Sequence, residues 1–279
     1  MKYDLHMHSD CSDGKYTRLE LLKKMNELEF KYASFCDHNY ISDDIDEINE
    51  KYKREYSEKQ KVKMILGTEF DIQEYSRLHI LGYDMKNIEI MQQILNKFEK
   101  ENTEICLELL KKIRSYYGID IPFEELTKYT KNGNVTKNVV VQWLIDNNYA
   151  DSVYDAGMRF TSKYSPCYVE RSRLKLKDVI ELIKESDGLA VMAHPSSMEM
   201  DDIELDLFIK KLCNFGLDGI EVYNADKTNE NQRLFYQSIA DKYNLFATSG
   251  SDFHNEAETP VFGVDNEYSN KFLKVLKRR

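Results

Sequence analysis

Short apolar runs alternate with longer amphipathic stretches over the first 86 residues of the chain. Runs rich in β-branched and aromatic residues predict strands, and apolar residues repeating every three or four positions predict helices. Strands are expected at Tyr3–His6, Tyr32–Cys36, Val62–Leu66 and Leu78–Leu81, and helices at Arg18–Phe30 and Asp43–Glu58. This alternation predicts parallel strands covered by helices.

The pattern changes between residues 87 and 175, where apolar positions recur only at helical spacing and charged residues are frequent. Helices are expected at Ile88–Tyr117 and Val135–Asn147, without a convincing strand. Alternation then resumes, with strands at Gly188–Ala193, Asp218–Tyr223 and Leu245–Ser249 and helices near Ile203–Phe215 and Asn229–Tyr243. The sequence therefore predicts an α/β domain formed by residues 1–86 and 176–279, interrupted by a helical insertion, 87–175.

The composition is that of a water-soluble protein, because 42% hydrophobic residues in a chain of 279 suffice for a core. No apolar run approaches the ~20 residues of a membrane span, and no secretory signal pattern is seen. Five scattered cysteines favour a reducing cytoplasm and disfavour a thiolate zinc site. A net charge of −10 disfavours binding of extended duplex nucleic acid.

All six histidines of the chain fall within or shortly after expected strands. In a parallel α/β barrel, the loops that follow the strands surround one mouth, so side chains at these places can meet. A single histidine there would more often be structural, but six of six, most with an acidic neighbour, favour a polynuclear metal centre. They are His6, His8, His38, His79, His194 and His254.

The first strand ends in the pattern H-x-H, formed by His6 and His8. An extended backbone points alternate side chains the same way, so both imidazoles can face one ion. The next loop carries Ser-Asp-Gly, in which Asp13 is a candidate ligand and Gly14 permits a tight turn. Asp10 is the alternative ligand in this loop.

Carboxylates accompany the histidines at later strand ends as well. We expect His38 to be a ligand and the adjacent Asp37 to orient an imidazole. Glu69 ends the third expected strand, and its two oxygens suit a bridge between ions. Asp252 and His254 follow the last strand, two residues apart and therefore on the same side.

Taken in order, the motifs H-x-H, SDG, DH, GxE, H, AHP and GSDFH resemble those of the PHP (polymerase and histidinol phosphatase) family of metal-dependent phosphoesterases. They run from His6 to His254. The resemblance implies a distorted seven-stranded (β/α) barrel, related to amidohydrolases, with three divalent ions of zinc, manganese or iron.

The resemblance also implies which residues hold each ion. The three sets are His6, His8, Glu69 and Asp252; Glu69, His79 and His194; and Asp13, His38 and His254. The positive charge of three divalent ions exceeds the negative charge of three carboxylates, so the centre would attract a phosphate ester. Ions ~3.5–4 Å apart would also share the hydroxide that attacks phosphorus. Glu69 and Asp252 would thus act in catalysis, and Asp37, Asp10 or a metal-bound water are the alternatives for the general acid.

The end of the insertion, with its P-x-Y-V element, resembles the PHP subgroup of 3′,5′-nucleoside bisphosphatases, some of which are 5′→3′ exonucleases on short RNA or DNA. The chain departs from this subgroup where Lys137 and Asn138 replace an Arg-His pair, and where Tyr-Ser-Pro replaces Gly-Lys-Pro. Tyr164 or Tyr168 could stack on a base. Basic side chains near the end of the insertion are the expected substrate contacts. They are Arg171 and Arg173 first, then Lys137 and Lys163.

We therefore expect a cytoplasmic, metal-dependent phosphoric ester hydrolase. Its substrates would be phosphate monoesters of small nucleotides, such as 3′,5′-bisphosphonucleosides, or short oligonucleotides, with the insertion covering the site. One alternative is a histidinol-phosphate phosphatase. Another, of a different class, is a non-catalytic sensor that binds metal or nucleotide.

Overall fold

The protein is described by a computed structural model that covers residues 2–56, 61–75, 77–130, 135–170, 174–257 and 259–276, the side chain of Asp226 excepted. It divides into two compact units. Met1–Gln92 and Leu174–Arg279 form the first, called the sheet unit below, and Gln93–Arg173 form the second, called the helical unit. The two strand-rich stretches of the sequence thus fold together.

Four strands form the first sheet of the sheet unit, in the order β3-β2-β1-β9. Their bounds are β1 Lys2–Met7, β2 Tyr32–Phe35, β3 Lys63–Met64 and β9 Val264–Asp265. β1, β2 and β3 run parallel because the helices α1 (Arg18–Glu27) and α2 (Ile45–Tyr56) return the chain to the same edge. Leu21 and Met25 of α1 and Tyr52 of α2 lie in the core that includes these strands.

Five strands form the second sheet, in the order β4-β5-β6-β7-β8. They are β4 Gly67–Asp71, β5 His79–Tyr83, β6 Leu189–Met192, β7 Gly219–Asn224 and β8 Phe246–Gly250. β5 runs antiparallel to both of its neighbours, whereas β6, β7 and β8 are parallel. Residues 72–78, which connect β4 to β5, are too few for a helical crossover, so the chain reverses there. The expectation of parallel strands throughout is wrong at this point.

Single bridges join the two sheets at both seams of the sheet unit. Met7 at the end of β1 pairs with Phe253, and His38 pairs with Glu69 of β4. The expected barrel is therefore not closed by continuous ladders. The space between the sheets is filled by large apolar side chains, among them Tyr3, Leu5, Tyr32, Leu81, Tyr83, Val191 and Phe272.

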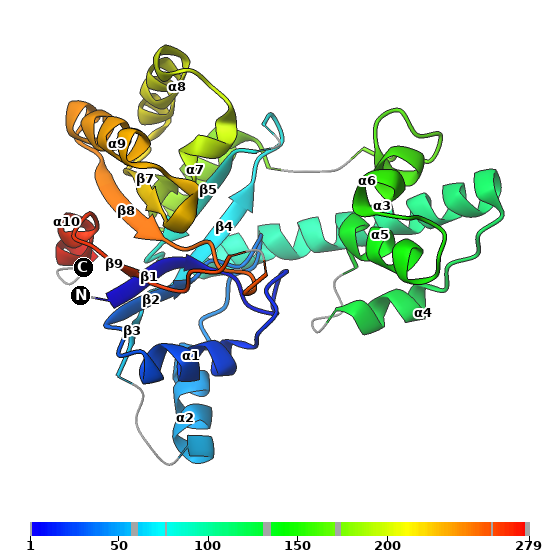
Figure 1. The fold of residues 1–279 in the computed structure, drawn as a ribbon, viewed down its shortest axis with the longest axis horizontal. Helices are drawn as coiled ribbons and strands as arrows, with labels where there is room; N and C mark the ends of the chain where they lie inside the picture. Colours follow the sequence, from blue (N-terminus) through cyan, green and yellow to red (C-terminus); the bar gives the residue numbers. More distant parts are fainter. Residues whose placement is uncertain are drawn as a thin grey trace. The chain divides into compact units, whose positions relative to one another are not determined.

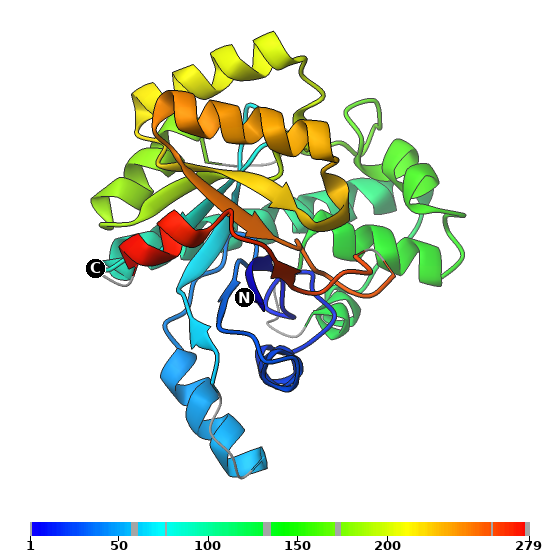
Figure 2. The same ribbon diagram turned by 60° about the vertical axis from the view of Figure 1, so that its left-hand side comes forward.

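Four further helices belong to the sheet unit: α7 Leu176–Glu185, α8 Asp202–Phe215, α9 Glu230–Tyr243 and α10 Asn270–Leu276. Figures 1 and 2 show α8 and α9 outside the second sheet, with α9 along β7 and β8. Asp201 begins α8 as its N-cap, and Gly216 ends it with a φ of 104°, a conformation that favours glycine. These signals fix where the helix starts and stops.

The described residues of the helical unit form helices and no strand. The helices are α3 Ile88–Tyr117, which begins in the sheet unit, α4 Phe123–Leu126, α5 Lys137–Asp146 and α6 Val153–Ala156. They enclose a core of their own that includes Leu109, Ile113, Val140, Leu144 and Phe160. No helix among the described residues is both long and apolar enough to cross a membrane.

Candidate metal centre

Side chains from several strand ends meet at one edge of the sheet unit. β1 ends immediately before His8, β6 ends two residues before His194, and β8 ends two residues before Asp252. β5 runs in the opposite direction, so its first residue, His79, pairs with Asp71, the last residue of β4. The reversal of β5 therefore brings its beginning to the edge where the other strands end.

Two residues of this edge have unusual backbone conformations. His194 has a φ of 24° and Asp252 a φ of 54°, in the region that glycine normally occupies. Such conformations cost free energy and persist where the surrounding structure holds them, which is common at functional sites.

The deepest group consists of His6, His8, Glu69 and Asp252, all of them buried. The Nε2 atoms of His6 and His8 are 3.3 Å apart, so both imidazoles face the same point. Nε2 of His8 lies 3.1 Å from Oδ1 of Asp252 and 3.2 Å from Oε2 of Glu69. Ligand atoms of all four residues are thus close enough to surround one ion.

A second group shares Glu69 and adds His79 and His194. Oε1 of Glu69 lies 2.9 Å from Nδ1 of His79 and 3.0 Å from Nε2 of His194. The two oxygens of Glu69 therefore face different sets of histidines, which is the arrangement of a carboxylate that bridges two ions.

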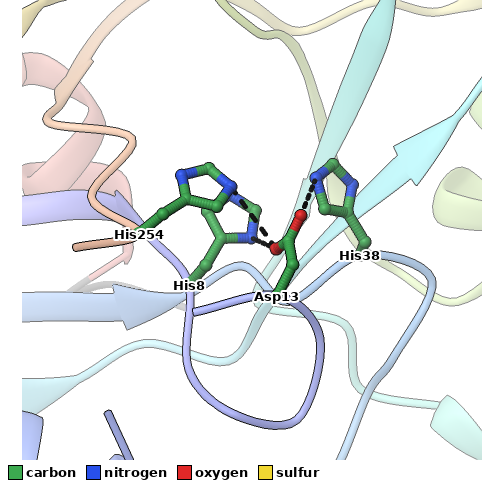
Figure 3. Close-up of side chains that lie close together, drawn as sticks. All are labelled: His8, Asp13, His38 and His254. Carbon is green, nitrogen blue, oxygen red and sulfur yellow. Dashed lines mark ion pairs between the residues drawn. The ribbon is translucent and has the colours of Figure 1, made fainter. Parts of the chain in front are cut away.

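The third group surrounds Asp13 in the loop after β1, as Figure 3 shows. Oδ1 of Asp13 lies 3.4 Å from Nε2 of His254 and 3.6 Å from Nδ1 of His8, and Oδ2 lies 3.8 Å from Nε2 of His38. The structure thus brings together all nine residues of the predicted ligand sets. Their role as ligands stays a prediction.

The electrostatics of the centre suit bound cations. Burial lowers the pKa of His8, but hydrogen bonds with Asp252 and Glu69 outweigh it and raise that pKa to about 9. For His38, Glu69 and Asp71 similarly outweigh burial and raise the pKa to about 10. Burial raises the pKa of Glu69, yet the surrounding imidazoles hold it well below its usual value. The carboxylates thus keep a negative charge that attracts cations, whether protons or metal ions.

Buried atoms without a hydrogen-bond partner give an independent test of fit. They include Nδ1 of His8, Oε2 of Glu69 and Nδ1 of His194. Buried polar atoms rarely lack a partner, so these atoms indicate an absent group. Imidazole nitrogens and carboxylate oxygens are ligands that zinc, manganese and iron accept, and the donor set therefore fits divalent ions of this kind.

Glu221 of β7 contacts two of the predicted ligands, His6 and His194. Its Oε1 lies 3.2 Å from Nδ1 of His6, while Nε2 of His6 faces the deepest group. Its Oε2 accepts hydrogen bonds from the backbone N–H of His194 and the side chain of Asn224, both at 2.8 Å. One carboxylate thus fixes the positions of two predicted ligands.

Asp37 has partners other than those expected. Its carboxylate accepts hydrogen bonds from the backbone and hydroxyl of Ser9, the hydroxyl of Ser12 and the guanidinium of Arg18. None of these partners is an imidazole, so the expectation that Asp37 orients a histidine is wrong. Both oxygens are committed to holding the loop that carries Asp13, and this disfavours Asp37 as the general acid.

The predicted substrate contacts belong to the helical unit or its end. Arg171 and Arg173 lie outside the described residues. Lys137 is buried, donates a hydrogen bond to the carbonyl of Val169 and lies over the ring of Tyr168, which indicates a structural role. Lys163 is exposed, with its Nζ 5.1 Å from the ring centre of Tyr164.

Two residues of the site were missed by the sequence analysis. Asp71 lies near His38 and His79, and the pattern E-x-D on an extended strand would have placed it on the same side as Glu69. Lys227 donates a 2.6 Å hydrogen bond to Oδ2 of Asp252. It lies after β7 with no motif around it, so the sequence holds no signal for this contact.

The chain is similar to several characterised proteins over most of its length. It is 25% identical over 260 residues to the 5′-3′ exoribonuclease Rnm of Escherichia coli, covering 90% of this chain and 85% of the relative. It is 24% identical to a phosphoribosyl 1,2-cyclic phosphate 1,2-diphosphodiesterase of Eggerthella lenta, covering 91% of this chain and 94% of the relative. It is 23% identical to the 3′,5′-nucleoside bisphosphate phosphatase of Chromobacterium violaceum, covering 91% of this chain and 88% of the relative.

Solved structures share the fold. An amidohydrolase from Chromobacterium violaceum with bound sulfate superposes with a TM-score of 0.75 at 22% identity, covering 95% of this chain and 92% of that one. A candidate metal-dependent phosphoesterase from Bifidobacterium adolescentis gives a TM-score of 0.76 at 21% identity, covering 97% and 95%. The mixed α/β fold expected from the sequence is thereby confirmed.

The sequence profile of the family described as "PHP domain" matches residues 4–273, which include every strand of both sheets except the first residues of β1. This match covers nearly the whole chain, and its relatives are hydrolases of phosphate esters. The chain belongs to the PHP domain family and is a metal-dependent phosphoesterase.

Proposed function

We propose that this phosphoesterase removes phosphate from small nucleotides, such as 3′,5′-bisphosphonucleosides, or cleaves short oligonucleotides. The proposal rests on one observation: histidine and carboxylate side chains form neighbouring sets that have residues in common. His8 and Glu69 each belong to two of the three groups described above. Groups that share ligands hold cations next to one another, as hydrolysis of a phosphate ester by a polynuclear centre requires.

Each group would hold one divalent ion, of zinc, manganese or iron. The ligands would be His6, His8, Glu69 and Asp252; Glu69, His79 and His194; and Asp13, His38 and His254. When bound, such ions make a coordinated water acidic and offset the charge of a phosphate. The chain contributes more imidazoles than carboxylates, and neutral imidazoles leave a positive surplus at the centre that draws in an anionic substrate.

Two relatives favour nucleotides and oligonucleotides as the substrate class. The Escherichia coli protein is named as an exoribonuclease and the Chromobacterium violaceum protein as a nucleoside bisphosphate phosphatase. Both are similar to this chain over about nine tenths of its length. We place the activity in the cytoplasm, because the five cysteines are odd in number and scattered along the sequence, which disfavours a disulfide framework.

The helical unit carries exposed side chains of the kind that contact nucleotides. Tyr154 and Tyr164 are 79% and 75% exposed, and Lys163 lies beside the second of them. Exposed aromatic rings next to basic groups suit bases that stack and phosphates that carry charge. Arg171 and Arg173 remain the predicted phosphate contacts.

The test is release of inorganic phosphate from adenosine 3′,5′-bisphosphate with added Mn²⁺, with and without chelator. Short 5′-phosphorylated RNA and DNA and L-histidinol phosphate form the comparison panel, and Glu69→Gln serves as the inactive control. We expect chelator-sensitive turnover of the nucleotide and the oligonucleotides. Faster turnover of L-histidinol phosphate would support the phosphatase alternative. Tight nucleotide binding by a fully metal-loaded but inert protein would support the sensor and refute the proposal.

A further inference from the structure

Asp71 lies among the histidines of the centre but belongs to none of the three ligand sets given above. It is the last residue of β4, two positions after Glu69, and its side chain is 26% exposed. Its backbone N–H donates a hydrogen bond to Oδ1 of Asn39, which holds the main chain independently of the carboxylate.

His38 presents its two ring nitrogens to different partners. Nε2 lies 3.8 Å from Oδ2 of Asp13, on the side of the third group. Nδ1 lies 3.3 Å from Oδ1 of Asp71 and 3.5 Å from Oε2 of Glu69. The nitrogen that faces Asp71 is therefore not the one that faces the third group.

His79 shows the same division with the nitrogens exchanged. Nδ1 lies 2.9 Å from Oε1 of Glu69, the oxygen that also meets His194 in the second group. Nε2 lies 3.4 Å from Oδ1 of Asp71. One oxygen of Asp71 thus faces one ring nitrogen of each imidazole, and the other nitrogen of His38 faces the third group while that of His79 faces the second.

We propose that Asp71 is a positioning residue that accepts N–H groups from His38 and His79 and thereby fixes both as ligands of two neighbouring ions. An imidazole that donates one N–H to a carboxylate offers the other nitrogen to a metal in a fixed orientation. Asp71 selects coordination through Nε2 for His38 and through Nδ1 for His79. The inference rests on the proposed polynuclear centre.

Zinc titration of the metal-free protein against a competing chelating dye provides the first test. Loss of a residue that orients a ligand typically weakens metal binding 10–100-fold. We expect a loss of that size in Asp71→Ala for two of the three ions, and a smaller loss in Asp71→Asn, whose amide oxygen still accepts one N–H. Asp46→Ala, at an exposed position of α2, is the matched control and should bind zinc as the wild type does.

Nitrogen NMR of the zinc-loaded protein provides the second test, and six histidines make a simple spectrum after selective labelling. We expect zinc on Nε2 of His38 and on Nδ1 of His79, with a proton on the other nitrogen of each. Zinc on Nδ1 of His38 would leave no N–H there for Asp71 to accept and would overturn the inference, as would unchanged zinc affinity in Asp71→Ala. A wild type that binds no zinc, manganese or iron would instead refute the proposed function itself.

Discussion

Replacement of Arg18 by Met should destabilise the sheet unit by about 3 kcal/mol. Arg18 and Asp37 form a buried ion pair, with Nη2 of the guanidinium 2.8 Å from Oδ2 of the carboxylate and side chains that are 6% and 0% exposed. Removing one partner of a buried pair costs roughly 3–5 kcal/mol, because the other charge is left in a dry site. Hydrogen bonds from Ser9 and Ser12 remain for Asp37, so we expect the lower end of that range.

Urea and thermal unfolding, followed by circular dichroism, measure this loss. For a unit of this size, about 3 kcal/mol corresponds to a fall in Tm of roughly 6–12 °C. The single tryptophan, Trp143, lies in the core of the helical unit, so its fluorescence reports separately on that unit. Lys23→Met on the same helix is the control, since Lys23 is 45% exposed and should change stability by less than about 0.5 kcal/mol.

The double variant with Asp37→Asn separates the pair from its surroundings. If the ion pair carries the effect, the double variant is more stable than the sum of the two single losses predicts, by about 1–3 kcal/mol. A loss below about 1 kcal/mol in Arg18→Met, or strictly additive losses, would show that the buried charges are not coupled as the distances imply.

Three further outcomes are expected. Glu69→Gln should lose at least two bound ions and nearly all phosphatase activity, because this carboxylate faces two groups, and elemental analysis of the purified variant checks the metal content. Gly14→Ala should weaken the third group, since a Cβ there would lie 2.2 Å from the carbonyl oxygen of His8; unchanged zinc stoichiometry would contradict this. Metal-free protein should lose stability as pH rises from about 6.5 to 10. In the folded state the pKa values of His8 and His38 are about 9 and about 10, above the ~6.5 of a histidine in the unfolded chain. The stabilisation from these bound protons is therefore complete below pH ~6.5 and is lost as the pH rises through the two folded-state values. A Tm, measured in the presence of chelator, that stays constant or rises over this pH range would refute the reasoning.

Periodicity predicted the helical elements well because amphipathic helices carry their signal locally. The expected helix at Ile88–Tyr117 agrees with α3 at both ends, and the expected α9 differs by one residue. Strand direction is not local: the apolar run at β5 reads the same in either direction, and only the short connection from β4 hinted at the reversal. Glu69 was expected at the end of the strand Val62–Leu66, but the chain forms two strands there, and Glu69 lies within the second of them, β4.

The candidate ligands could be anticipated because their motifs lie at strand ends, where chain topology brings them together. The contacts of the residues around these ligands could not be anticipated. Asp37 was expected to orient an imidazole because it lies in a histidine motif, yet its carboxylate meets Arg18 instead. Lys227 reaches Asp252 from a different loop, a contact that depends on the packing of β7 against β8.

The bridge between Met7 and Phe253 has a consequence for the timing of biosynthesis. The deepest group unites His6 with Asp252, residues that are far apart in the sequence. At a translation speed of about 5–20 residues per second, the ribosome needs on the order of 12–50 s to progress from one to the other. During that interval His6 and His8 can meet Glu69 but not Asp252, so the deepest group is complete only after nearly the whole α/β domain has been synthesised.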